Sequence, residues 1–113
     1  MGCLAINLRS RYIVVVADLR FEWDPRKADA NLRKHGVAFD EAHTAFFDDN
    51  ALVLADPDHG TVEDRFILLG AASSRKLLVV CHCYRGNDEV IRLISARRAN
   101  RREMATYRER TPP

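Results

Sequence analysis

The sequence predicts one α+β domain, in which a small antiparallel sheet of about four strands is preceded by two helices and followed by one. A length of 113 residues is typical of a single domain. With 47% hydrophobic and 30% charged residues, the chain can form a real but small core. Hydrophobic periodicity changes along the chain in the order β-α-α-β-β-β-β-α, and the links between the later strands are short enough for a meander.

The amino-terminal part is expected to hold a strand and a helix. Tyr12–Val16 is β-branched and aromatic, which favours a strand that could continue toward Phe21. Asp24 and Pro25 then match the N-cap and the first position of a helix, and Gly36 matches its C-cap.

A second short helix and four strands are expected in the middle of the chain. Phe39, Ala42 and Phe46 follow at helical spacing, and the acidic residues 48–49 end that segment. Turn-rich segments then separate four strand candidates. These are Ala51–Ala55, Arg65–Gly70, Leu77–Tyr84 and Val90–Ala96.

The closing segment, Arg97–Arg108, contains no helix breaker and is predicted to be a helix. At about 100° per residue, one face carries five arginines and the opposite face is apolar. The arginines are Arg97, Arg98, Arg101, Arg102 and Arg108, and the apolar residues are Ala96, Ala99, Met104 and Tyr107. Such a face suits an RNA or DNA backbone, because guanidinium groups bind phosphate bidentately. A solvated face, or one that docks an acidic protein, is an equally good interpretation.

Charge is unevenly distributed along the chain, although the net charge is only +2. Residues 1–35 carry +3, residues 36–64 carry −8 and residues 65–113 carry +7. A basic carboxy-terminal half indicates a polyanion or an acidic partner, whereas segments that neutralise each other within one fold explain the pattern equally well.

Several classes of protein are excluded or disfavoured. The longest apolar run, Tyr12–Ala17, is too short to cross a membrane. Three cysteines without framework spacing indicate a reducing cytoplasm. In Cys81-His82-Cys83, strand alternation turns the histidine away from the two cysteines, so no metal site is expected there. We expect no cofactor.

The sheet segments carry charged groups without a nucleophile motif or a phosphate-binding glycine loop. A metal-free ribonuclease does not need these, because the 2′-hydroxyl of RNA is the nucleophile and the protein supplies proton transfer and positive charge. The groups in question are Glu63, Arg65, His82, Arg85 and Arg92. His82 alternates with apolar residues, so a core histidine is as well supported as a catalytic one. Trp23 is more readily explained as core than as a base-stacking platform.

Three separated segments resemble, in order, the signatures of the BrnT toxin family. Together they cover roughly residues 20–108. The first signature is Phe21-Glu22-Trp23-Asp24-Pro25, Lys27, Asn31–Val37 and Phe39–Ala42; the second is Glu63–Phe66 with Gly70; the third is Ile91–Ala99, Arg102, Glu103 and Tyr107.

The resemblance implies a small ribonuclease toxin of a type II toxin–antitoxin module with a RelE-like fold. It implies a metal-independent endoribonuclease that inhibits translation, neutralised by a ribbon-helix-helix antitoxin of the BrnA type. Operator DNA would be contacted only through that antitoxin. The alternative is a non-catalytic module that binds RNA or the antitoxin and co-represses its operon.

The resemblance also implies site residues. Arg65 and Arg97 occupy the positions of the family's functional arginines and would hold the scissile phosphate, with Glu63 or His82 as the base. Arg85 and Arg98 match less strictly. The expected RNA-binding residues are Arg85, Arg98, Arg101, Arg102 and Arg108.

Two segments are expected: residues 1–20 as an extension and residues 21–110 as the toxin domain. Family members usually begin close to the Phe-Glu-Trp-Asp motif. The extension is thus either an upstream translation start or an extra strand. Leu19–Trp23 could itself be the family's first strand.

Overall fold

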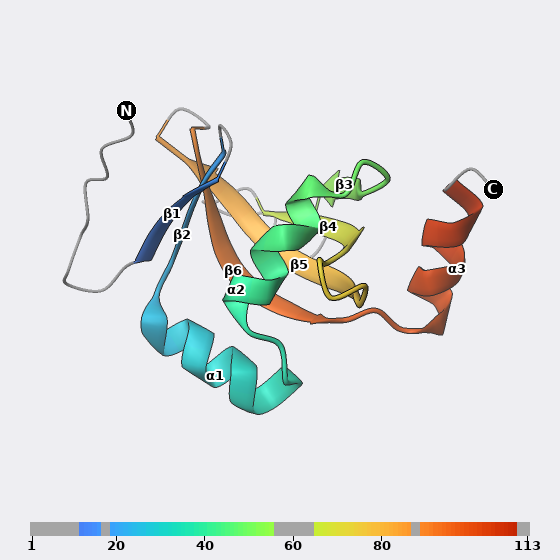
Figure 1. The fold of residues 1–113 in the computed structure, drawn as a ribbon, viewed down its shortest axis with the longest axis horizontal. Coiled ribbons are helices and arrows are strands. Elements are labelled where there is room, and N and C mark those ends of the chain that lie inside the picture. The colour runs from blue at the N-terminus through green and yellow to red at the C-terminus, as the bar shows by residue number, and fades with distance from the viewer. Residues whose placement is uncertain (1–11, 17–18, 56–64, 87–88, 111–113) are drawn as a thin grey trace.

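The computed structural model describes residues 12–16, 19–55, 65–86 and 89–110. A six-stranded sheet in the order β1-β2-β6-β5-β4-β3 forms its centre, and helices pack against it (Figure 1), which confirms the α+β class. The elements are β1 Tyr12–Val16, β2 Leu19–Trp23, α1 Pro25–His35, α2 Phe39–Ala42, the 3₁₀ helix η1 His43–Phe47, β3 Leu52–Ala55, β4 Phe66–Ala71, β5 Leu77–Arg85, β6 Val90–Arg98 and α3 Arg101–Arg110.

The sheet differs from the predicted four-stranded antiparallel one in two respects. β3 to β6 do form an antiparallel meander, but β1 and β2 extend it to six strands. β2 also pairs with β6 in parallel. A local pattern cannot reveal this pairing, because it joins segments that lie far apart in the sequence.

Helix α1 begins and ends where the sequence predicts. The Asp24 side chain accepts a hydrogen bond from the Arg26 N–H at 2.9 Å, which caps the first turn. Gly36 adopts φ 71°, and its N–H donates to the carbonyl of Leu32. This left-handed C-cap conformation is one that glycine adopts without steric cost.

The predicted second helix is divided between α2 and η1, and it packs closely on the sheet. Phe39, Ala42 and Ala45 are buried. A Cβ atom added at Gly70 of β4 would lie 2.9 Å from the carbonyl oxygen of Ala45. Gly70 therefore allows the backbone of η1 to rest directly on the sheet.

The main core lies between the sheet and the layer of α1, α2 and η1. Trp23 is only 4% exposed and meets Phe39 edge to face, which confirms its assignment to the core. Buried Asn31 joins α1 to β6: its side chain donates to the carbonyl of Ala96 and accepts from the Ala96 N–H. It also donates to the carbonyl of Val37, so one side chain fixes the helix, the chain after it and the strand.

Helix α3 starts at Arg101, so the prediction of a helix from Arg97 is wrong. Arg97 and Arg98 instead continue β6. Asn100 and Glu103 form a reciprocal capping box in which each backbone N–H donates to the other side chain at 2.8 Å. This cap sets the start of the helix. The apolar side of α3 packs through Met104 and Tyr107 onto a second, smaller cluster of Leu69, Val79 and Ala99.

No helix in the described part of the chain is long and apolar enough to cross a membrane.

Candidate nucleic-acid interface

A row of side chains crosses the sheet on the face opposite the main core. Ile91 and Leu93 of β6 are buried in that core, so strand alternation directs Arg92 to the other face. Arg92 lies opposite Cys83 of β5 and opposite Glu22 of β2 in the two ladders. Residues paired in this way share one face of the sheet.

Arg65 extends this row at β4. It directly precedes Phe66, which pairs with His82. The same antiparallel register, continued by one residue, places Arg65 opposite Cys83. Arg65 and Arg92 thus flank Cys83, two strand spacings or about 10 Å apart at the backbone. Two long guanidinium side chains at this separation can converge on one phosphate group.

The sequence identifies Arg92 only as a charged group of the sheet, without a role, and Glu22 is not among the site residues that it predicts. Glu22 belongs to the row because β2 pairs with β6, and Arg92 belongs to it because β6 pairs with β5. Arg92 is half-buried, and no carboxylate of the described residues lies within ion-pair distance of it. Glu22 is 5% exposed. The strict alternation of Leu19–Trp23 is the signal that identifies β2 and the face on which Glu22 lies.

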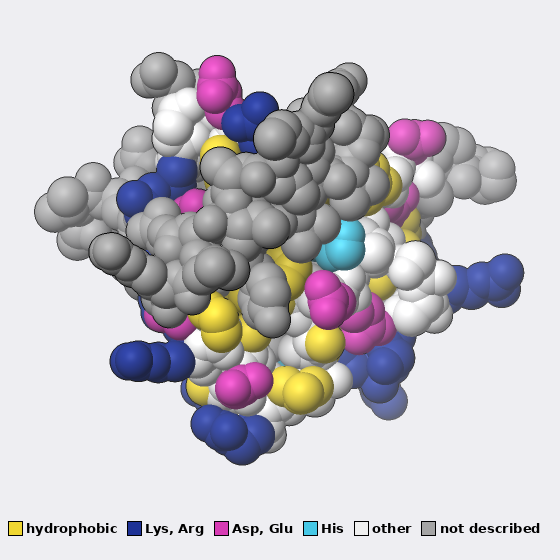
Figure 2. All heavy atoms as spheres, turned by 60° about the vertical axis from the view of Figure 1, so that its left-hand side comes forward, with side chains coloured by type: hydrophobic (Ala, Val, Ile, Leu, Met, Phe, Trp, Pro, Cys, Tyr) yellow, Lys and Arg dark blue, Asp and Glu magenta, His cyan; other side chains and the backbone are white. Residues whose placement is uncertain are grey.

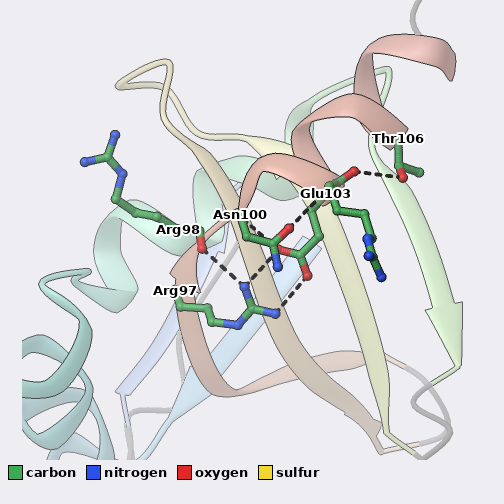
Figure 3. Close-up of polar contacts among 6 residues, drawn as sticks. Arg97, Arg98, Asn100, Glu103 and Thr106 are labelled. Atoms are coloured by element: carbon green, nitrogen blue, oxygen red, sulfur yellow. Dashed lines mark hydrogen bonds and ion pairs between the residues drawn. The ribbon is translucent and has the colours of Figure 1, made fainter.

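Arg97 is held by a carboxylate at the junction of β6 and α3 (Figure 3). Its two terminal nitrogens donate to the two oxygens of Glu103 at 2.9 and 2.8 Å, and Nη1 also donates to the carbonyl of Arg98. These hydrogen bonds raise the pKa of Arg97 and lower the pKa of Glu103. Since Glu103 also belongs to the capping box with Asn100, Arg97 fixes the start of α3.

The structure does not place Arg97 beside Arg65. Arg97 lies opposite Val79, whereas Arg65 falls opposite Cys83, four residues further along β5. This corresponds to about 13 Å of strand. Arg85 lies at the far end of β5, opposite Val90, and is half-buried. The predicted arginines are therefore spread along the sheet.

His82 is a core residue. Its side chain is completely buried, and its ring packs edge to face on Phe46, with centroids 4.8 Å apart. Nδ1 contacts the carbonyl of Val80 at 3.1 Å, and Nε2 contacts the hydroxyl of Tyr84 at 3.3 Å. Burial lowers the pKa of His82 and outweighs the hydrogen bond to Val80. The ring is thus a neutral part of an aromatic cluster.

The remaining predicted residues lie on the surface or outside the described residues. The exposed ones are Arg98 at the end of β6 and Arg101, Arg102 and Arg108 on α3. Glu63 lies outside the described residues. Cys81 and Cys83 project to the face opposite His82, and the described residues contain no group of three potential metal ligands.

Besides the Arg97–Glu103 pair, a second contact, at Tyr107, acts as a latch that holds α3 to the rest of the fold. Its hydroxyl donates to Asp48 at 2.6 Å, and the same carboxylate accepts hydrogen bonds from the N–H groups of Ala71 and Asn50. Burial opposes ionisation of Asp48, but the three hydrogen bonds outweigh it and lower its pKa.

A groove between α1 and α2 is acidic, in contrast to the arginine-rich face of the sheet. It has a volume of about 590 Å³, and its lining includes the apolar residues Trp23, Leu32 and Phe39 and the acidic residues Asp29 and Asp40. Figure 2 shows apolar and acidic side chains together on the lower half of this face, with Lys and Arg side chains at its margins. Such a groove repels a polyanion.

Fold and site together define a small α+β protein with a cationic sheet face. The chain belongs to the BrnT family: a family model described as "Ribonuclease toxin, BrnT, of type II toxin-antitoxin system" matches residues 23–103. The crystal structure of the Brucella abortus ribonuclease toxin BrnT resembles it with a TM-score of 0.52 and 26% sequence identity, over 70% of this chain and 94% of that chain. No curated protein matches the sequence. Membership of this family makes the protein a ribonuclease toxin with an antitoxin as its partner.

Proposed function

We propose that this ribonuclease toxin cleaves RNA without a metal ion, using the 2′-hydroxyl of the RNA as the nucleophile. The 2′-oxygen bonds to the adjacent phosphorus and the bond to O5′ breaks, which leaves a 2′,3′-cyclic phosphate and a free 5′-hydroxyl. The protein must accept the proton of the 2′-hydroxyl, allow a proton to reach O5′ and stabilise the charge that develops on the phosphate oxygens.

The observation that carries this proposal is the position of Arg65 and Arg92 on either side of Cys83. Two guanidinium groups reaching over the same face can bind both non-bridging oxygens of one phosphate. We assign the scissile phosphate to these two arginines. Arg97, whose terminal nitrogens are taken by Glu103, is assigned to positioning α3 at the edge of this surface.

Glu63 is the proton acceptor that we propose, because it lies two positions before Arg65 in the sequence. The burial of His82 favours Glu63 over the histidine, since a base must reach the 2′-hydroxyl directly or through one water. The exposed arginines Arg98, Arg101, Arg102 and Arg108, together with Arg85, would bind the RNA backbone beyond the cleaved bond.

We further propose that the antitoxin is a BrnA-like ribbon-helix-helix protein and that the pair contacts operator DNA only through it. This proposal is supported by membership of the family and by the resemblance of all three sequence signatures.

Cleavage of a synthetic RNA in excess EDTA tests the mechanism. The purified protein should cut the RNA, and a substrate with a single 2′-deoxy nucleotide at the cut position should stay intact there. Activity that EDTA abolishes and Mg²⁺ restores would contradict the metal-independent mechanism. RNA binding without cleavage at any protein concentration would favour the non-catalytic alternative.

A further inference from the structure

A cleft of about 340 Å³ lies between the turn that joins β4 to β5 and the inner side of α3. Among the described residues, four cations line it and no acidic residue does. The cations are Arg75 and Lys76 of the turn, Arg98 at the end of β6 and Arg108 of α3. Figure 1 shows the turn, the end of β6 and α3 at the same end of the sheet.

The cations of this cleft are largely uncompensated. Within the described part of the chain, no carboxylate lies within ion-pair distance of Arg75, Arg98 or Arg108, and Lys76 lies 3.7 Å from Glu41. Figure 3 shows the Arg98 side chain pointing away from the Arg97–Glu103 pair. Like charges gathered on one hollow repel each other, so an anion bound between them gains from several cations at once.

Both walls of the cleft are anchored. In the turn, the Arg75 N–H donates to the carbonyl of Ala72 and the Ser73 N–H donates to the hydroxyl of Thr44. On the other side, the Arg97–Glu103 pair and the hydroxyl of Tyr107 hold α3. The backbone of both walls is thus fixed, and only the exposed cationic side chains must become ordered when a ligand binds, which favours a specific subsite.

The cleft also offers apolar surface. Leu77, Met104 and Tyr107 line it beside the cations. A nucleotide carries its phosphate next to a sugar and a base, and aromatic or apolar side chains commonly cover these in proteins that bind single strands. A carboxylate of an acidic protein would bind the cations but would not cover this apolar surface.

We propose that this cleft binds a phosphate group of the RNA strand several nucleotides away from the scissile one. The inference rests on the proposed ribonuclease function and adds a remote subsite to it. Leu77 lies in the cleft and Cys83 lies in the row of Arg65 and Arg92, six residues apart on β5. This corresponds to about 20 Å of strand. An RNA too short to span that length cannot use the cleft.

The test compares two double variants that each remove two positive charges. R75Q/R108Q changes the cleft, and R26Q/K27Q changes exposed residues of α1 as the matched control. Each is measured for binding of a 2′-O-methyl 12-mer at increasing NaCl concentrations and for cleavage of a 12-mer and of a dinucleotide. The cleft variant should bind the 12-mer at least fivefold more weakly, with a salt slope reduced by about 0.7 for each phosphate that it no longer neutralises. Its KM for the 12-mer should rise much more than its KM for the dinucleotide, and the control should match the unchanged protein in all assays.

The outcomes separate the two proposals. If the unchanged protein cleaves RNA and both double variants bind it equally well, the cleft inference is wrong and the ribonuclease mechanism stands. If the unchanged protein neither binds nor cleaves RNA, the proposed function fails, and the cleft inference fails with it. If the cleft variant keeps RNA affinity but loses the antitoxin, the cleft binds a protein and the inference is overturned. Thermal melting checks the fold, and R98Q replaces the double variant if that variant melts at a lower temperature.

Discussion

The arginines of this chain differ in their surroundings. Arg65 and Arg92 are half-buried on the sheet face opposite the main core, Arg97 is taken up by Glu103, and Arg98 points away from that pair (Figure 3). Their substitutions should therefore have different consequences.

Replacing Arg65 or Arg92 with alanine should affect the reaction far more than the fold. An arginine that stabilises charge developing on phosphate contributes on the order of 100-fold to the rate, or about 3 kcal/mol. Single-turnover cleavage and thermal melting measure the two effects separately. Arg33→Ala on α1 is the control, and lysine at position 65 should restore activity only in part because it lacks the bidentate fork. Wild-type rates in R65A would remove this residue from the site.

Arg97→Ala should instead destabilise the start of α3. The Arg97 side chain is 42% exposed, so its pair with Glu103 should contribute at most about 1 kcal/mol to the free energy of unfolding. A double-mutant cycle of R97A and E103Q measures the coupling by urea unfolding. E103Q can keep the capping box while it removes the charge. Additive effects of the two substitutions would show that the ion pair contributes nothing.

That contribution should also depend on pH. The pKa of Glu103 is lowered in the fold from an ordinary value of 4.5. The stability from its ionised form is therefore fully present above about pH 4.5 and is lost as the pH falls through the lower pKa of the folded state. Unfolding free energies of the unchanged protein and of R97A should converge in acid, where the glutamate is neutral.

His82 should give the free energy of unfolding a second pH dependence, in a different range. Its pKa is lowered in the fold from an ordinary value of 6.5, so the unfolded chain takes up a proton at a higher pH than the folded chain does. Stability from the neutral ring is complete above pH 6.5 and decreases as the pH falls below that value. H82Q should reduce the slope of unfolding free energy between pH 5 and 7. An unchanged slope in H82Q would contradict the assignment of His82 as a neutral core residue.

At the scale of elements, α3 depends on latches at two places. It contains no buried residue, and it contacts the sheet mainly through Met104 and Tyr107. Removing the hydroxyl in Tyr107→Phe leaves the Asp48 carboxylate with two of its three donors. Loss of this hydrogen bond should cost about 1–2 kcal/mol. The amide protons of α3 should then exchange faster, and those of β5 should be unaffected. Equal protection of α3 in both proteins would rule out Tyr107 as a latch.

Elements governed by local rules were predictable from the sequence. Asp24, Pro25 and Gly36 fix α1 through capping, and the spacing Asn100-x-x-Glu103 contains the signal for the true start of α3. The spacing of the arginines nevertheless predicts too early a start for this helix. It includes Arg97 and Arg98, which pairing with β5 holds in an extended conformation. The place of Glu22 beside Arg92 was not predictable, since it requires the register between β2 and β6.

At the scale of the whole molecule, charge is separated between two surfaces. The groove beside α1 carries two aspartates, and the cleft beside α3 carries four cations.

Expression of the unchanged protein should stop growth, and expression with its antitoxin should restore it. R65A should be harmless yet still bind the antitoxin, which affinity capture of the tagged pair can show. A harmless R65A that no longer binds its partner would indicate a structural role for Arg65.

The place of β6 in the sheet has a consequence for the order of events during synthesis. β6 follows the other five described strands along the chain and leaves the ribosome after them, yet it lies between β2 and β5 in the sheet. Until residues 90–98 have emerged, β2 lacks the neighbour that joins it to the other strands, and Arg92 is not yet present beside Cys83. The described sheet therefore cannot close during synthesis before residues 90–98 have left the ribosome, and the site that we propose for the phosphate forms no earlier than the sheet.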